Sequence, residues 1–190
     1  MRTFATTRRS LLASAAALLP LAGCAPETKV AEVTVPKAPV PDVLGAQLYT
    51  VRNLIPEKAE ETIKAIADIG YKAVEMGRAD TPTLIPLCKK YNLATPSAHF
   101  EYACLTGQWE NYGGKPPRAG YNLQAALAEA KKAGIDYFTI PYINPKDRGT
   151  MNMFLRLADQ LNKAGEQAAK MGLKVGYHNH AFEFTKYGNF

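Results

Sequence analysis

The three histidines of the chain and two polar residues near predicted strand ends could perform chemistry together. His178 and His180 are two positions apart in the β-rich run 174–184. Because side chains alternate across a strand, both imidazoles are predicted to face one side, where they could hold one metal ion or one substrate. His99, Glu75 and Gln47 also stand near the ends of predicted strands. In a parallel sheet these ends meet at the edge that carries the chemistry, so the sequence predicts one polar site there.

Each of these residues also has a structural explanation. A lone histidine near a strand end, such as His99, often serves only as a hydrogen-bonded structural residue. Glu75 is harder to explain in that way, because an inward carboxylate in an apolar strand is costly unless it is paired or metal-bound. Trp109, in the predicted loop 101–120, could stack on a sugar ring or pack locally.

The elements that must position these residues alternate along the chain. Strands are predicted at 43–52, 72–77, 94–100, 137–143 and 174–184, and helices at 57–69, 81–91, 121–133 and 149–171. Gly70, Gly134 and Gly172 end three of the helices, whereas Pro86 is unexpected inside the helix at 81–91. Such alternation predicts an α/β fold of parallel strands joined by right-handed crossovers.

Two architectures fit this alternation, an open doubly wound sheet and a (β/α)₈ barrel. No glycine-rich phosphate-binding turn follows a predicted strand, which disfavours the nucleotide-binding form of the open sheet. A complete barrel takes about 250 residues. An open five-stranded sheet would leave two unpaired apolar edges. We therefore expect residues 43–190 to hold only the first five βα units of a barrel, without about three C-terminal units. A complete five-stranded protein is the alternative.

The N-terminal segment is predicted to be an export signal. Arg8 and Arg9 form a twin-arginine pattern, and the apolar run at 11–23 is too short to span a bilayer. The sequence LAGC at 21–24 is typical of a lipobox, in which Cys24 is lipidated. Residues 25–42 contain four prolines and no helical periodicity. We expect a signal peptide at 1–23, the lipidated cysteine and a flexible linker at 24–42, and a protein anchored by lipid on the periplasmic side of a bacterial membrane. A buried N-terminal helix is the alternative.

The charge of the chain does not point to nucleic acid. There are 23 basic and 17 acidic residues, which gives a formal net charge of +6. Three basic residues lie in the predicted signal, so 20 against 17 remain, a surplus of +3. No basic stretch is interleaved with aromatic residues. With Cys24 lipidated, Cys88 and Cys104 remain, and the sequence leaves open whether they pair.

Four segments resemble the sugar phosphate isomerase/epimerase family. They are 45–52 (GAQLYTVR), 70–75 (GYKAVE), 97–99 (SAH) and 176–184 (GYHNHAFEF), of which the last is the most specific. The resemblance covers residues 43–190. It implies the xylose isomerase-like TIM barrel, a fold that endonuclease IV shares.

The resemblance also implies a divalent metal ion (Mn, Mg, Zn or Co) at the barrel mouth. The ligand from the fifth strand is a glutamate in many members, and the residue aligned with it here is His178. Further ligands would come from later strands, so this chain is expected to be inactive by itself. From their places at the strand ends, we expect Glu75 and His180 to be catalytic, and Gln47, His99 and His180 to orient the substrate.

The expected function is that of a metal-dependent isomerase or epimerase for a sugar, keto-sugar or cyclitol. Removal of a proton next to a carbonyl develops negative charge on oxygen, which such an ion stabilises, and a carboxylate moves the proton. Two alternatives remain: a lyase or hydrolase of modified glycosides on the same scaffold, and a non-catalytic, membrane-tethered carbohydrate-binding protein. The partner in each case is a small carbohydrate. Cleavage of DNA is disfavoured, since export removes the substrate.

Overall fold

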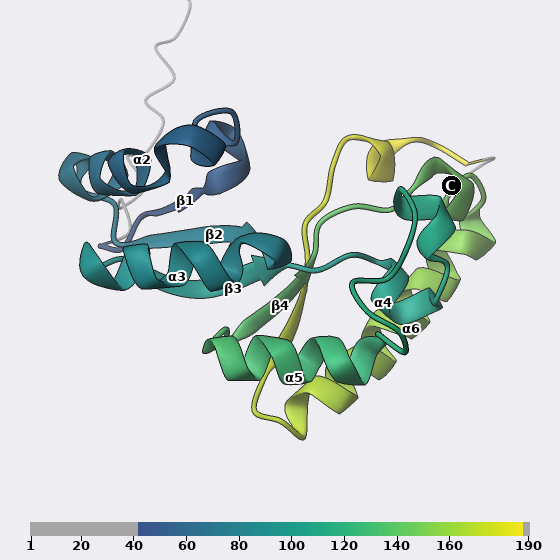
Figure 1. Ribbon diagram of the computed structural model, residues 1–190. Coiled ribbons are helices and arrows are strands. Elements are labelled where there is room, and N and C mark those ends of the chain that lie inside the picture. Colours follow the sequence, from purple (N-terminus) through teal and green to yellow (C-terminus); the bar gives the residue numbers. More distant parts are fainter. Residues whose placement is uncertain (1–41, 188–190) are drawn as a thin grey trace, which may run out of the picture. The chain divides into compact units, whose positions relative to one another are not determined.

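A computed structural model describes residues 42–187, which form a parallel sheet of five strands with helices between them (Figure 1). The strands are β1 (Gly45–Gln47), β2 (Ala73–Gly77), β3 (Ala94–His99), β4 (Tyr137–Ile140) and β5 (Lys174–Tyr177). They lie side by side in chain order, and each neighbouring pair is parallel. The predicted α/β fold is confirmed. The predicted signal peptide at 1–23 and the linker up to residue 41, with Cys24, lie outside the described residues.

Four longer helices connect the strands in the described part of the chain. They are α2 (Ile55–Ile69), α3 (Thr81–Lys90), α5 (Leu123–Ala133) and α6 (Met151–Ala169). The side chains of Asn122 and Thr150 accept backbone N–H groups in the first turns of α5 and α6, which fixes where these helices begin. Gly70 ends α2 in the left-handed region, at φ 111°. Helix α3 continues through Pro86, as the sequence predicted.

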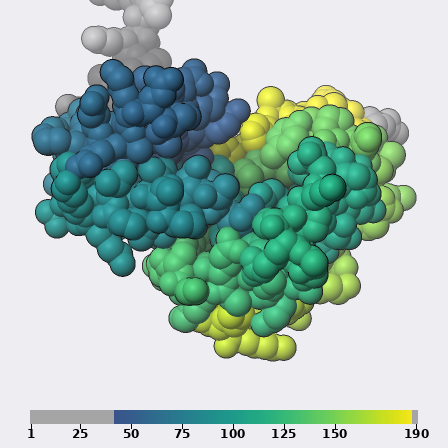
Figure 2. All heavy atoms as spheres, in the orientation of Figure 1, coloured from purple at the N-terminus to yellow at the C-terminus, as the bar shows by residue number. Residues whose placement is uncertain are grey.

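The two faces of the sheet differ in chemistry. One face is buried under the helices and is apolar: the strand residues Val74, Met76, Ala98, Phe138 and Ile140 are each 1% exposed or less. Successive helices contact one another, and their side chains close most of the gap that the ribbons leave (Figure 2). Since side chains alternate along a strand, the neighbours of these residues point to the opposite, polar face. The core therefore lies between the sheet and the helices, and the polar side chains lie on the other face of the sheet.

Three strands are shorter than predicted by three residues or more, whereas β2 and β3 each differ by one residue. β1 ends at Gln47, because its side chain accepts the N–H of Tyr49 and the chain turns into a 3₁₀ helix at Leu48–Val51. β4 ends at Ile140, where Pro141 has no N–H to continue the ladder. β5 ends at Tyr177 instead of continuing to residue 184, and Phe182–Phe184 forms a 3₁₀ turn.

The long loop after β3 is more ordered than predicted. It contains helix α4 (Ala103–Thr106) and a 3₁₀ turn at Trp109–Tyr112. Trp109 is 8% exposed, and its ring centroid lies 5.8 Å from that of Tyr121. The suggestion that Trp109 stacks on a sugar is therefore wrong.

The two cysteines of the described residues, Cys88 and Cys104, are free. Both are buried, and burial raises the pKa of the Cys88 thiol to about 11 and that of Cys104 to about 12. Thiols of such high pKa are poor nucleophiles at neutral pH, so neither is a catalytic candidate. Within residues 42–187, no helix combines the length and the apolar character that crossing a bilayer requires.

Candidate functional site

Side chains from four strands meet at the carboxyl edge of the sheet. Gln47 ends β1, Glu75 lies in β2, His99 ends β3, and His178 directly follows β5. The parallel register places Gln47 opposite Glu75. The backbone N–H of His178 donates to the carbonyl of Ile140 at 3.0 Å, which extends the sheet by one residue. The structure thus brings together the residues that the sequence predicted to form a site.

Glu75 is the charged centre of this group. Its Oε1 lies 2.6 Å from Nε2 of His99, and its Oε2 accepts a hydrogen bond from the hydroxyl of Ser97. The Ser97 hydroxyl also lies 2.9 Å from Oγ1 of Thr139, so polar contacts cross from β2 to β4. Burial by itself would raise the pKa of Glu75, but the contacts with His99 and Ser97 outweigh it and hold the pKa below its usual value. Glu75 is therefore a carboxylate at neutral pH.

His99 has a polar neighbour at each ring nitrogen. Its Nδ1 lies 3.2 Å from Nε2 of Gln47, whose Oε1 accepts the backbone N–H of Tyr49. Its Nε2 is buried and lies 2.6 Å from Oε1 of Glu75.

His178 and His180 lie together, as predicted. Their ring centroids are 5.0 Å apart, and the ring of His178 meets that of His99 edge-on at 5.2 Å. The reason differs from the prediction, because His180 lies beyond β5. Its backbone N–H donates to Oε2 of Glu183 at 2.8 Å, while Oε1 of Glu183 accepts the hydroxyl of Tyr177. A loop folded back by Glu183 therefore places His180.

The environment of His178 favours its neutral form. Partial burial of the ring lowers its pKa, and the neighbouring His99 and His180 lower it further. A neutral imidazole keeps a lone pair that a metal ion can use.

A pocket of about 550 Å³ opens beside these residues. This volume is in the range of small-molecule sites. The side chain of Tyr142 forms part of the wall and meets the ring of His180 edge-on, with 5.5 Å between centroids. The pocket is lined by Gln47, Tyr49, Thr50, His99, Pro141, Tyr142, His178 and His180.

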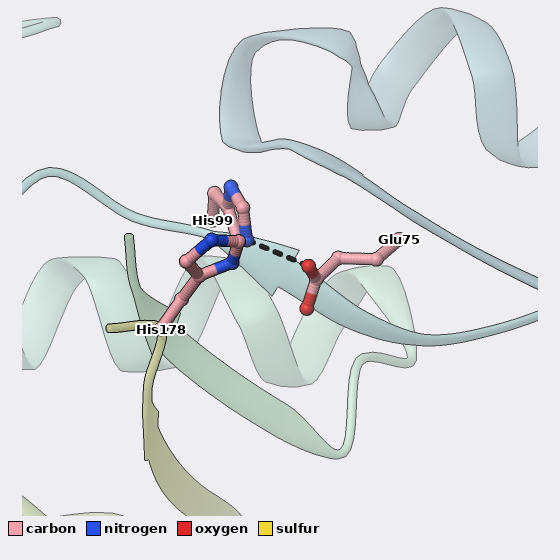
Figure 3. A group of neighbouring side chains, drawn as sticks. All are labelled: Glu75, His99 and His178. Carbon is pink, nitrogen blue, oxygen red and sulfur yellow. Dashed lines mark ion pairs between the residues drawn. The ribbon is translucent and has the colours of Figure 1, made fainter. Parts of the chain in front are cut away.

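Glu75, His99 and His178 also form a candidate metal site. Each offers one ligand atom, these atoms lie within 4.8 Å of one another, and the side chains point toward one another (Figure 3). Carboxylate and imidazole ligands suit Zn, Mn and Co ions. The sequence prediction gave this role to His178 alone, and the structure adds Glu75 and His99, from the neighbouring strands β2 and β3, as further candidates. Glu75 and His178 fit an ion, whereas the fit of His99 depends on which ring nitrogen carries its proton.

The chain matches solved structures that have this arrangement of strands and helices. One sugar phosphate isomerase/epimerase from Parabacteroides distasonis is 19% identical, with a TM-score of 0.55 and coverage of 80% of this chain and 56% of that one. A second from the same organism is 18% identical, with a TM-score of 0.60 and coverage of 77% and 57%. The chain has the fold of the sugar phosphate isomerase/epimerases. No family profile matches the chain, and no curated protein matches it.

The sugar phosphate isomerase/epimerase fold also hosts a different chemistry. An AP endonuclease of family 2 from Brucella melitensis is 18% identical, with a TM-score of 0.51 and coverage of 75% and 57%. The expected α/β fold of the xylose isomerase-like barrel type is confirmed by these matches. The chain spans 56% to 57% of the length of the three solved structures. Since one fold carries several activities, the activity has to be argued from the site.

Proposed function

We propose that the protein is a metal-dependent isomerase or epimerase of a sugar, keto-sugar or cyclitol, which transfers a proton at a carbon next to a carbonyl. The observation that supports this is the meeting of Glu75, His99 and His178 beside one pocket, on the fold of the sugar phosphate isomerase/epimerases. Because the chain spans little more than half of those structures, the substrate and activity of the whole protein belong to this proposal.

The residues of the pocket have distinct roles in this proposal. His178 would be a ligand of the divalent ion (Mn, Mg, Zn or Co), which supplies a positive charge to stabilise an oxygen anion. Glu75 is ionised and would take the proton from carbon. His180 lines the pocket and would hold an oxygen of the carbohydrate, and His99 lines the same pocket beside Glu75.

Exchange with solvent deuterium tests the proposed reaction. The whole protein, with Mn²⁺ or Co²⁺, is incubated in D₂O with a panel of ketoses, aldoses and keto-cyclitols, and proton NMR follows the signal next to the carbonyl. We expect exchange that Glu75→Gln abolishes and that Glu61→Gln, at a side chain 78% exposed, leaves unchanged. Exchange that persists in Glu75→Gln would contradict the role of Glu75.

The same incubations separate the alternative functions. Products of bond cleavage would point to a lyase or hydrolase of modified glycosides. Saturable sugar binding without exchange and without metal would point to a non-catalytic carbohydrate-binding protein. Loss of bound metal in His178→Ala, but not in Asn179→Ala, is expected by elemental analysis, and equal metal content would remove the ligand role of His178.

We further propose that the protein is exported and anchored in the membrane by a lipid on Cys24. The twin-arginine pattern and the LAGC run at 21–24 support this. Incorporation of a labelled fatty acid that is lost in Cys24→Ser would support lipidation. Replacement of Arg8 and Arg9 by lysine is expected to keep the protein in the cytoplasm, and export of that variant would exclude the twin-arginine route.

A further inference from the structure

We infer that Gln47 fixes the ring proton of His99 on Nε2, so that His99 sets an N–H group beside the Glu75 carboxylate and offers no lone pair to a metal ion. The catalytic role of Glu75 rests on the proposed function. The position of the proton does not, because it follows from the contacts of Gln47 alone.

The first step is the orientation of the Gln47 amide. The chain leaves β1 through a 3₁₀ turn, and this turn brings the backbone N–H of Tyr49 against the Gln47 side chain. A backbone N–H can only donate, so the amide atom that faces it must be the oxygen Oε1. The amide nitrogen Nε2 is then the atom that faces His99, at 3.2 Å from Nδ1.

The second step is the tautomer of His99. The amide nitrogen of Gln47 has two N–H groups and no lone pair to offer, so Nδ1 of His99 must be the acceptor. A proton on Nδ1 would set two donors face to face across 3.2 Å. The neutral ring therefore carries its proton on Nε2.

The third step is the environment of that Nε2–H group. The His99 side chain is 13% exposed and lines the pocket. Nε2 is buried and lies 2.6 Å from Oε1 of Glu75. A proton on Nε2 therefore lies beside the negative charge of the carboxylate and stabilises it, whereas a lone pair at that position would face the same charge.

A metal ion does not fit His99 in this state. An ion needs a nitrogen with a free lone pair. The lone pair of Nδ1 accepts from Gln47, and Nε2 carries the proton. His178 has no such constraint, because none of its ring nitrogens accepts a hydrogen bond within the described residues. The metal role in this cluster therefore belongs to His178, with His99 as a donor beside it.

An ionised Glu75 favours a carbonyl compound, a ketose or a keto-cyclitol, over a simple polyol, because a carboxylate can take a proton from carbon only where a neighbouring carbonyl accepts the electron pair. Glu75 would take a proton from the carbon next to the carbonyl, the C–H electron pair would form a C=C bond, and the carbonyl π pair would move to oxygen. The Nε2–H of His99 would hold the Glu75 carboxylate in place for this transfer. Return of the proton to the same carbon would restore the ketone. Its return to the former carbonyl carbon, with the proton of the neighbouring hydroxyl passing to the oxygen anion, would give the isomer, and Glu75 is a carboxylate again in both cases. Gln47 would act as a positioning residue that does not need to touch the substrate.

Nitrogen NMR of the histidines tests the inference without a substrate. The chain has three histidines, so the full chain labelled with [¹⁵N]histidine gives few signals, and His178→Ala and His180→Ala assign that of His99 by elimination. We expect a proton on Nε2 of His99 in the wild type. Gln47→Glu replaces the donor by an acceptor and should place a proton on Nδ1. Gln124→Leu, at an exposed position of α5, should leave the His99 signal unchanged.

Zn²⁺ alone is the second probe. In the wild type, Zn²⁺ should perturb His178 and leave the Nε2 proton of His99 in place. Gln47→Glu should bind Zn²⁺ about tenfold or more tightly, because His99 can then offer Nε2 to the ion. A wild-type His99 with its proton on Nδ1, or one that gives up its Nε2 proton to Zn²⁺, would overturn the inference. If the tautomer is as expected but no deuterium exchange occurs with any carbonyl sugar, the proposed function fails and the role of Gln47 stands.

Discussion

Replacement of Gly176 by alanine tests the row of polar contacts that crosses the sheet beneath the site. Gly176 lies in β5 opposite Thr139 of β4, and a Cβ at this position would lie 3.0 Å from Oγ1 of Thr139. Thr139 is 8% exposed, and its hydroxyl is 2.9 Å from that of Ser97. The hydroxyl therefore cannot move away without weakening its contact with Ser97.

The size of the effect follows from these contacts. Overpacking of this kind costs about 1–3 kcal/mol, and a weakened hydrogen bond adds up to about 1 kcal/mol. We expect Gly176→Ala to lower the free energy of unfolding by about 2 kcal/mol. With the usual dependence on urea, the unfolding midpoint should fall by about 1 M.

Urea unfolding followed by circular dichroism measures this change. Gly165→Ala is the matched control, because Gly165 lies inside α6 and a Cβ there would meet no atom within 4 Å. Removing a glycine from a helix interior should raise stability by about 0.5–1 kcal/mol. If Gly176→Ala unfolds at the wild-type midpoint while the control shifts upward, Thr139 has room to move and the reasoning about this row is wrong.

Three further results are expected. Ser97→Ala removes a donor to the Glu75 carboxylate, so the pKa of Glu75 should rise, and a ¹³C NMR titration that shows no rise would exclude this contact. Because the folded-state pKa of Glu75 is lowered, its stabilising contribution is present above the unfolded value of about 4.3 and is lost as the pH falls through the folded value. Urea unfolding over a pH series should show this loss in the wild type and not in Glu75→Gln. Arg78→Met should lower the free energy of unfolding, measured by heating, by about 1–3 kcal/mol. It leaves the partly buried Glu101 without the bidentate hydrogen bonds that Arg78 donates to it. Arg118→Met, at a side chain 57% exposed, should cost about 0–1 kcal/mol, and equal costs for the two arginines would contradict the argument from burial.

The strands that the sequence predicted well are those whose pattern follows from burial under helices. β2 and β3 begin or end within one or two residues of their predicted limits, since Val74, Met76 and Ala98 face the helix layer and Glu75 between them does not. β1 and β5 were predicted too long. Each is followed by a turn that a side chain stabilises by accepting a backbone N–H, and such a bond leaves no trace in a hydrophobic pattern.

The residues that form the site could be predicted from the sequence, but the contacts between their side chains could not. The rule that parallel strands end at one edge brought Gln47, Glu75, His99 and His178 together before any coordinates. The pairing of Glu75 with Ser97 depends on the register between β2 and β3, which the sequence does not specify. The roles of the two nitrogens of His99 depend on which neighbour faces each of them, and this is a property of the folded chain alone.

The strands lie in the sheet in the same order as in the chain, and this order determines how the pocket forms during folding. Within residues 42–187, each strand pairs only with the strand made just before it or just after it, so the sheet can grow stepwise through contacts that are short in sequence. The pocket residues arrive in the same succession, from Gln47 through His99 to the two histidines after β5. During synthesis the groups of the candidate site therefore come together only when β5 joins β4.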